Sequence, residues 1–320
     1  MTCSALLRSL VAAAILAAGL PVIAAAQAPA PASRDRILIA HRGASAYAPE
    51  HTRAAYELAI AQGADYVEQD LAVTKDGVLV CIHDVSLERT TNVEELFPDR
   101  FKTDTEGRRR WYVADFTLAE IKRLDAGSWF DPKFAGETLL TWDEAVDIVW
   151  GRAGMYPELK DAAFYRERGV DIVAVFAAAL ERRGLPWTTP AQGRAPLAVQ
   201  SFDEQAVRDA ARLLPRVPRT FLFGDRAGVQ KWLSNAGTVK TLATFATDLG
   251  PNKRILEERP EIVAWAHEAG LTVTAWTVSS LAEKTAYPGL TEEMQHLLYD
   301  LGADALFTDN PNKFPRQRQP

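Results

Sequence analysis

The sequence predicts an α/β protein, a TIM (β/α)8 barrel with a small insertion after the third strand. Three observations lead to this fold class. Apolar strand-like runs alternate with helical patterns along residues 36–320, the runs number eight, and most of them finish with a polar or ionisable residue. Alternation of this kind predicts a mainly parallel sheet. Eight parallel strands close a barrel, and the functional side chains of such barrels gather at the carboxyl ends of the strands.

The candidate strands and helices follow from the spacing of apolar residues. The strands are Ile37–His41, Tyr66–Leu71, Val78–His83, Met155–Leu159, Leu197–Phe202, Thr220–Phe223, Leu271–Val278 and Ala305–Thr308. The helices are Thr52–Gln62, Trp142–Trp150, Asp171–Arg183, Glu204–Leu213, Pro260–Ala269 and Thr291–Leu301. Gly63, Gly184, Gly270 and Gly302 each follow a helical run, where a glycine accommodates left-handed backbone at the helix end.

The interval between His83 and Thr141 interrupts this rhythm. It is polar, charged and aromatic, with little alternation of strand and helix, and it is too long for a simple loop. We therefore expect residues of about 88–138 to form an insertion over the barrel mouth. A second irregular stretch, Gly224–Asn252, permits no assignment of elements.

The N-terminal segment is predicted to lie outside the barrel. Arg8 is the one charged residue before Arg34, and an Ala-rich apolar run ends in small residues at Ala26. This is the pattern of a secretory signal peptide, with an uncleaved anchor helix as the alternative. We expect a signal peptide over 1–26, a linker over 27–35, and a periplasmic or secreted domain over 36–320 without stable membrane insertion. Cys81 would then be the one remaining cysteine, so no internal disulfide is expected.

The charge balance argues against a nucleic-acid partner. The chain has 36 Lys and Arg against 42 Asp and Glu, a formal net charge of −6. Attraction to phosphates supplies most non-specific binding to nucleic acids, and an acidic chain lacks it. A small anionic substrate stays compatible, because local cations can dominate a pocket. A monomer and a homodimer both fit the sequence.

Carboxylates on two predicted strands indicate either a metal site or a buried ionic network. Residues i and i+2 of a strand point to the same face, so Glu68 projects with Asp70, and Glu158 with Lys160. Crowded carboxylates repel one another, and a hard cation such as Ca²⁺ or Mg²⁺ relieves that repulsion. Pairing of the glutamates with Arg42 and Lys160 is the alternative.

Histidines and cations extend this candidate site. His41 and His83 end two predicted strands, where a pair of imidazoles suits general acid–base catalysis near neutral pH. Arg42 offers a planar fork to phosphate oxygens, and Lys160 offers a point charge. His51 stands at the start of a predicted helix and is interpreted as a packing or capping residue.

These motifs, in this order, resemble the glycerophosphodiester phosphodiesterase family, and most of all its periplasmic bacterial type. The resemblance starts with IAHRGASAYAPEHT at Ile39 and runs through EQD and IHD to Asp84. PELK at Pro157, QSFD at Gln200 and ALFTDNP at Ala305 match further along the chain. The resemblance covers nearly all of the predicted mature domain.

The resemblance implies a TIM barrel with a small insertion, and it implies roles for the matching residues. These roles are general acid and base for His41 and His83, metal binding for Glu68, Asp70 and Glu158, and phosphate binding for Arg42 and Lys160. Glu50 would support the loop after the first strand. Phe202 and Trp276 would wall the substrate pocket, although packing in the core is the alternative for both.

The expected reaction is hydrolysis of a glycerophosphodiester, a small-molecule substrate, to an alcohol and sn-glycerol 3-phosphate. The expected cofactor is a divalent cation, Ca²⁺ rather than Mg²⁺, because the resemblance is strongest to the insertion-bearing periplasmic type and calcium tolerates flexible coordination. Neither the assignment of acid and base to the two histidines nor the choice between water and the glycerol 2-hydroxyl as nucleophile follows from the sequence.

Two other functions stay open. The first is a lysophospholipase D or sphingomyelinase D-like phosphodiesterase, whose apolar groove would come from aromatic residues of the insertion. These are Phe101, Trp111, Trp129 and Phe130. The second is a non-catalytic protein that binds phosphate esters.

Overall fold

The computed structural model describes residues 36–189, 194–281 and 286–318. The predicted signal peptide and linker lie outside these residues. Within the described residues, no helix is both long enough and apolar enough to span a membrane.

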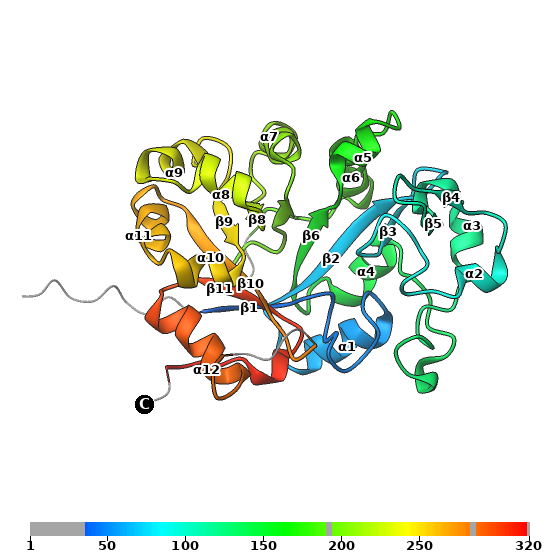
Figure 1. Ribbon diagram of the computed structural model, residues 1–320, viewed down its shortest axis with the longest axis horizontal. Coiled ribbons are helices and arrows are strands. Elements are labelled where there is room, and N and C mark those ends of the chain that lie inside the picture. Colours follow the sequence, from blue (N-terminus) through cyan, green and yellow to red (C-terminus); the bar gives the residue numbers. More distant parts are fainter. Residues whose placement is uncertain (1–35, 190–193, 282–285, 319–320) are drawn as a thin grey trace, which may run out of the picture. The chain divides into compact units, whose positions relative to one another are not determined.

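Eight parallel strands form a closed barrel (Figure 1), which confirms the predicted fold class. The barrel strands are β1 (Ile37–Ala40), β2 (Tyr66–Val73), β6 (Gly154–Leu159), β7 (Val199–Ser201), β8 (Arg219–Phe223), β9 (Asp248–Pro251), β10 (Thr272–Val278) and β11 (Ala305–Thr308). Each strand pairs with the next in parallel register, and pairing of β1 with both β2 and β11 closes the circle.

One predicted barrel strand was wrong, and one barrel strand was not predicted. The run Val78–His83 contains β3 (Leu79–Cys81), which pairs antiparallel with β2 outside the barrel. The missing member is β9, which lies in the stretch Gly224–Asn252 and pairs with β8 and β10. Only five residues separate β2 from β3, whereas a parallel crossover needs about a dozen or more.

Helices cover the outer face of the barrel. They are α1 (Arg53–Ala61), α4 (Trp142–Val149), α5 (Ala162–Arg166), α6 (Ile172–Arg183), α7 (Glu204–Leu213), α8 (Arg226–Trp232), α9 (Ala236–Leu242), α10 (Lys253–Glu258), α11 (Glu261–Glu268) and α12 (Leu290–Gln295), which continues as a π-helical turn over His296–Asp300. The side chain of Thr52 accepts from the Ala55 N–H and caps α1. The capping interpretation of His51 was therefore wrong.

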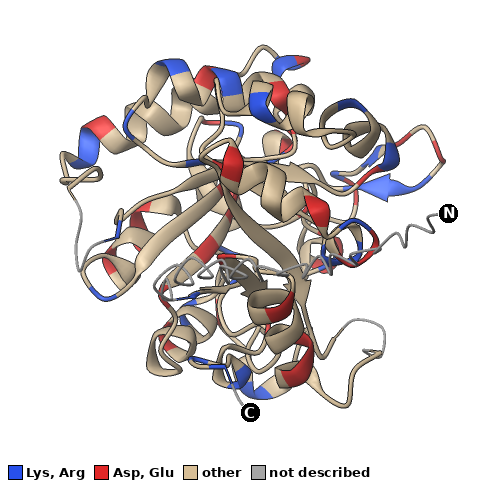
Figure 2. Ribbon diagram, turned by 90° about the vertical axis from the view of Figure 1, so that its left-hand side faces the viewer, with Lys and Arg blue, Asp and Glu red and all other residues tan. Residues whose placement is uncertain are grey.

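The insertion stands between β3 and α4 and lies on the right of Figure 1. It contains α2 (Val93–Leu96), α3 (Leu118–Ile121), the short hairpin β4 (Lys102–Thr103) and β5 (Arg109–Arg110), and 3-10 turns at Val113–Asp115 and Pro132–Phe134. Trp111 and Phe116 are fully buried within it. In the view of Figure 2, basic and acidic residues mix over the outer helices and loops, without an extended face of one sign.

Aromatic rings fill the barrel interior below its carboxyl end. Tyr156 packs edge-to-face against Tyr66, with ring centroids 5.5 Å apart, and against Phe307 at 5.3 Å. These rings and the small side chains around them form an inner apolar cluster. Two larger apolar clusters fill the space between the strands and the helices. The inner rings give the residues above them a rigid base.

A polar group is buried in this interior as well. Asp248, at the start of β9, is 4% exposed and accepts from the Thr272 hydroxyl at 2.5 Å. Burial raises the pKa of Asp248 to about 6, although the hydroxyls of neighbouring threonines oppose that rise. The folded state therefore holds this proton up to a higher pH than the unfolded chain does.

Replacement of Asp248 by Asn should stabilise the protein at alkaline pH. Because the folded pKa of about 6 exceeds the ordinary value of 3.8, the free energy of unfolding falls as pH rises from about 4 to 6, by up to about 3 kcal/mol. Asn carries no charge to bury, so urea midpoints should be higher for Asp248→Asn than for the parent at pH 8. The two proteins should converge below about pH 3.8, and an equal difference in stability at pH 8 and pH 3.5 would contradict this account.

Candidate active site

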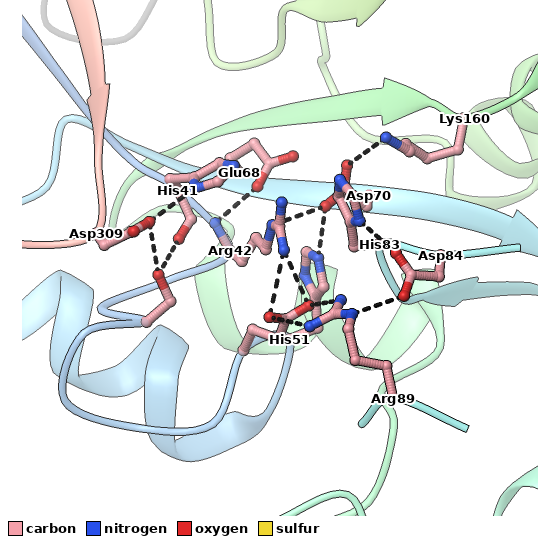
Figure 3. A network of polar contacts seen from close by, with 12 residues as sticks. His41, Arg42, His51, Glu68, Asp70, His83, Asp84, Arg89, Lys160 and Asp309 are labelled. Atoms are coloured by element: carbon pink, nitrogen blue, oxygen red, sulfur yellow. Dashed lines mark hydrogen bonds and ion pairs between the residues drawn. The ribbon is translucent and has the colours of Figure 1, made fainter. Parts of the chain in front are cut away.

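One cavity brings together most of the residues that the sequence singles out. It has a volume of about 110 Å³ and opens at the carboxyl end of the barrel. Its lining includes His41, Arg42, Glu68, His83, Glu158, Lys160, Phe202 and Trp276. Asp70 does not line this cavity but lies directly behind it, with one oxygen 3.3 Å from Nε of Arg42. All nine predicted site residues thus converge at this place, and Figure 3 shows six of them, His41, Arg42, Glu68, Asp70, His83 and Lys160.

Three buried carboxylates form the centre of the site. Glu68 and Asp70 point inward from β2, and Asp70 is in register with Glu158 of β6. Burial, with the charge of Asp70 as a smaller cause, raises the pKa of Glu68 well above its ordinary value and that of Glu158 to about 8, although Arg42 and Lys160 act against these rises. Burial also acts against the charge of Asp70, but Lys160 and other cations nearby hold its pKa well below the usual range.

Two cations balance this negative charge. Nζ of Lys160 lies 3.1 Å from a Glu158 oxygen and 3.8 Å from Oδ1 of Asp70. The backbone N–H of Arg42 donates to Glu68 at 2.7 Å, while its guanidinium contacts Glu50 and Asp70. Burial opposes both positive charges, yet the surrounding carboxylates raise the pKa of each above its ordinary value. The predicted alternative of an ionic network therefore exists in this structure.

The loop after β1 places Arg42 at the cavity. Arg42 adopts a left-handed backbone with φ of 57°, followed by Gly43 with φ of 90°. A Cβ atom on Gly43 would lie 2.8 Å from backbone atoms of Ala55 in α1, closer than packed atoms approach. Glycine at this position lets the loop fold tightly onto α1, which directs the N–H of Arg42 toward Glu68.

The same carboxylates have the chemistry of a site for a hard cation. An all-oxygen set of three carboxylates suits Ca²⁺ or Mg²⁺. Burial is the main cause of the raised pKa of Glu68 and Glu158, and the charge of Asp70 adds repulsion that a dication relieves. Among the described residues, His51, Glu68 and Asp70 offer ligand-type atoms within 4.8 Å of one another. Glu158, whose carboxylate lies 3.1 Å from Nζ of Lys160, is not part of that group.

His41 has a carboxylate partner of its own. Its Nδ1 lies 2.6 Å from Oδ1 of Asp309, which follows β11. The Ser45 hydroxyl donates to the same oxygen at 2.9 Å, and the Ser279 hydroxyl donates to the other. Asp309 thus fixes the ring orientation of His41 and leaves Nε2 as the ring nitrogen that is free to face the cavity.

His83 has a matching partner but a different setting. It lies in the loop after β3 and not at the end of a barrel strand, which corrects the predicted pair of barrel-strand histidines. Its Nδ1 lies 2.6 Å from Asp84, which also accepts from Nε of Arg89 at 2.6 Å. Arg89 binds both oxygens of Glu50, at 2.7 and 3.0 Å. Glu50 therefore joins the loop after β1 to the loop of His83.

Two aromatic residues stand on the other side of the cavity. The rings of Phe202 and Trp276 meet edge-to-face at 5.4 Å, and Nζ of Lys160 lies 5.9 Å from the centre of the Phe202 ring. Phe202 is 45% exposed, so it lines the opening rather than the core. Trp276 is held by a bond from its Nε1 to the carbonyl of Gly250 at 2.7 Å.

The aromatic residues of the insertion lie elsewhere. Phe101 packs on the buried Trp111, and Trp129 packs on Phe130. None of these four is among the described residues that line the cavity. No observation of the structure therefore favours an acyl-chain groove built from them.

Sequence reasoning missed several members of the site. His51 is buried and bonds Asp70 at 2.9 Å, while Asp309 and Asp84 bond the two histidines. Asp84 directly follows His83, and Asp309 follows the last strand. Both positions carry the same signal as the residues that were singled out, namely an ionisable residue at a strand end. Arg89 lies inside the predicted insertion, and its sequence position gave no such signal.

A family model matches residues 41–313 of this chain, and its description is the glycerophosphoryl diester phosphodiesterase family. A glycerophosphodiester phosphodiesterase of Bacillus subtilis is 31% identical over 296 residues, covering 90% of this chain and 88% of the relative. One of Haemophilus influenzae is 29% identical over 330 residues, covering 87% and 88%.

Solved structures agree with this likeness. A phosphodiesterase of Oleispira antarctica, solved in complex with the product sn-glycerol 3-phosphate, matches with a TM-score of 0.66 and 27% identity, over 87% of this chain and 95% of that one. A glycerophosphodiester phosphodiesterase of Agrobacterium tumefaciens matches with a TM-score of 0.64 and 26% identity, over 87% and 98% of the two chains.

Removal of the Arg89 charge should make the fold more sensitive to acid. Burial opposes the charge of Glu50, but Arg89 and Arg42 lower its pKa from 4.5 to about 2. This pair therefore stabilises the protein above pH 4.5, and the stabilisation disappears as pH falls toward 2. Arg89→Met should cost about 1.5–3 kcal/mol at pH 7 and move the midpoint of acid unfolding, followed by circular dichroism, to higher pH.

Arg108→Met is the matched control for this prediction. Arg108 pairs with Asp104 on the exposed surface of the insertion, where ion pairs contribute little to stability. If Arg89→Met and Arg108→Met show the same acid midpoint as the parent, Glu50 is not held in the way described.

Proposed function

Because this chain belongs to the glycerophosphoryl diester phosphodiesterase family, we propose that its cavity hydrolyses glycerophosphodiesters by metal-assisted general acid–base catalysis. The observation that carries the proposal is the meeting of two histidines, each bonded to its own carboxylate, with three buried carboxylates and two cations around one small cavity. The products are an alcohol and sn-glycerol 3-phosphate. The latter is the product bound in the Oleispira antarctica relative.

Glu68, Asp70 and Glu158 would hold the divalent cation, and we propose Ca²⁺ rather than Mg²⁺. Calcium accepts irregular sets of carboxylate ligands, whereas magnesium demands near-octahedral geometry. When bound, a divalent ion of this kind draws electron density from the phosphoryl oxygens and lowers the charge that must be stabilised during attack. The residual negative charge of the three carboxylates is balanced by Arg42 and Lys160.

The protein groups then divide the remaining work. Arg42 and Lys160 bind the non-bridging oxygens and stabilise charge that develops on them. One histidine removes a proton from the nucleophile as the new P–O bond forms. The nucleophile is water, or the glycerol 2-hydroxyl, in which case water then opens the cyclic phosphate. The other donates a proton to the leaving alcohol as its P–O bond breaks. Asp309 and Asp84 keep the two imidazoles oriented throughout.

Metal dependence of turnover tests the proposal as a whole. Purified protein is incubated with glycerophosphocholine, and glycerol 3-phosphate is followed with a coupled assay. EDTA should abolish product release, and Ca²⁺ should restore it more fully than Mg²⁺. Full activity in EDTA would reject the metal site, and no release with any divalent ion would reject this substrate class.

Single replacement of either histidine should nearly abolish turnover. His41→Ala or His83→Ala should lower kcat by about 10²-fold or more, because each variant lacks one proton-transfer group. Thermal melts should stay close to that of the parent, since both side chains border the cavity. His296→Ala serves as the control, because this ring contacts Asp300 and Tyr287 and does not line the cavity. Near-normal turnover of either cavity variant contradicts the assignment.

A further inference from the structure

His51 lies behind the carboxylate cluster and makes a bond with each of its ring nitrogens. It is 1% exposed. Its Nε2 lies 2.9 Å from Oδ2 of Asp70, and its Nδ1 lies 2.9 Å from the hydroxyl of Tyr56 in α1. Figure 3 shows the ring below Asp70, on the side away from Lys160. Tyr56 is itself fully buried, beside the thiol of Cys81.

The chemistry of these partners fixes the direction of both bonds. A carboxylate oxygen only accepts, so the hydrogen between His51 and Asp70 belongs to Nε2. A neutral imidazole has one N–H, and Nδ1 is then the acceptor for the Tyr56 hydroxyl. Tyr56 thereby selects the tautomer of His51 that donates to Asp70.

The same geometry argues against His51 as a metal ligand. A ring nitrogen that carries a hydrogen has no lone pair to give to a cation. The short distances among His51, Glu68 and Asp70 therefore describe a histidine that holds a carboxylate, not a mixed nitrogen and oxygen donor set.

The two oxygens of Asp70 have different surroundings. Oδ2 receives the His51 N–H at 2.9 Å and lies 3.3 Å from Nε of Arg42. The nearest ion-pair partner of Oδ1 is Nζ of Lys160, at 3.8 Å, beyond hydrogen-bond distance. Oδ2 is thus held at hydrogen-bond distance by His51, whereas the contact of Oδ1 with Lys160 is a longer ion pair.

The backbone at His51 supports a specific role for this side chain. His51 has a left-handed backbone with φ of 58°, which is uncommon for a residue with a side chain. Its N–H donates to the carbonyl of Arg42 at 3.2 Å, so the loop holds His51 against the residue that contacts Asp70. Such outliers persist where the surrounding structure requires them.

We propose that His51 is a positioning residue for the divalent-cation site: its Nε2–H, set by Tyr56, holds Oδ2 of Asp70 so that Oδ1 faces the cation. This inference rests on the proposed function, because it concerns the same cation. Hydrogen-bond partners of metal-ligating carboxylates typically change metal affinity by about 10–100-fold when they are removed.

Metal affinity, measured apart from turnover, tests the proposal. Ca²⁺ alone, and then Mg²⁺ alone, is titrated by calorimetry into the EDTA-treated parent and into variants at His51. His51→Ala should weaken the dissociation constant about 10–100-fold. His51→Gln should restore it to within about threefold of the parent, because the Gln amide can place an N–H near the position of Nε2.

Two further variants make the readout specific. Tyr56→Phe removes only the hydroxyl that selects the tautomer, so its affinity should fall between those of the parent and His51→Ala. His267→Ala removes another histidine bonded to an aspartate, Asp304 at 2.8 Å, on the outer helix α11, and should leave the affinity unchanged. Thermal melts of every variant confirm that it is folded.

Each outcome has one meaning. Loss in His51→Ala with recovery in His51→Gln supports the proposal. Unchanged affinity in a folded His51→Ala protein overturns it, and equal loss in the Ala and Gln variants overturns the donor role in favour of direct ligation. A parent that binds neither ion overturns the cation site itself, and with it the proposed function, which separates the two failures.

Discussion

The mutual repulsion of three buried carboxylates is the constraint around which this site is arranged. Glu68, Asp70 and Glu158 are all less than 10% exposed, and burial of unpaired charge is costly unless partners compensate it. Lys160 and Arg42 supply positive charge within 4 Å. Removing one partner of such a buried group typically costs about 3–5 kcal/mol, so the cations are tied to the stability of the site as well as to its chemistry.

Barrel register brings the carboxylates together. On β2, Tyr66, Glu68 and Asp70 alternate onto the inner face, and on β6 the partner of Asp70 is Glu158. A shift of one residue would turn every one of these side chains to the outer face. The edge-to-face contacts of Tyr66, Tyr156 and Phe307 oppose such a shift. The apolar base of the barrel therefore maintains the polar geometry above it.

Much of this arrangement could be predicted from sequence because strand periodicity and strand ends are local signals. The placement of Glu68 with Asp70 needs only the two-residue repeat of a strand. It was harder to predict which strands belong to the barrel, because Val78–His83 has the pattern of a strand whether it enters the barrel or folds back as β3. The connection Thr74–Val78 is the feature that distinguishes the two cases, because it is too short for a parallel crossover. β9 escaped prediction because its four residues include Gly250 and Pro251, which weaken a strand pattern.

Contacts between distant loops could not be predicted in the same way. His51 is separated from Asp70 by 19 residues and Glu50 from Arg89 by 39, and neither spacing corresponds to a strand or helix repeat. Only the folded barrel places the loop after β1 against the start of the insertion. Ion pairs of this kind depend on tertiary geometry, so residue type alone identifies candidates without their partners.

The two histidines are supported by different parts of the molecule. His41 takes its partner from the loop after β11, the strand next to β1 in the barrel, so the barrel itself sets its position. His83 depends on Asp84 and Arg89, where the chain leaves β3 for the insertion, and Arg89 is tied back to the barrel through Glu50. A change in the insertion can therefore reach His83 through Arg89 while the contacts of His41 stay intact. The Glu50–Arg89 pair therefore links the insertion to the loop after β1 beside the candidate site.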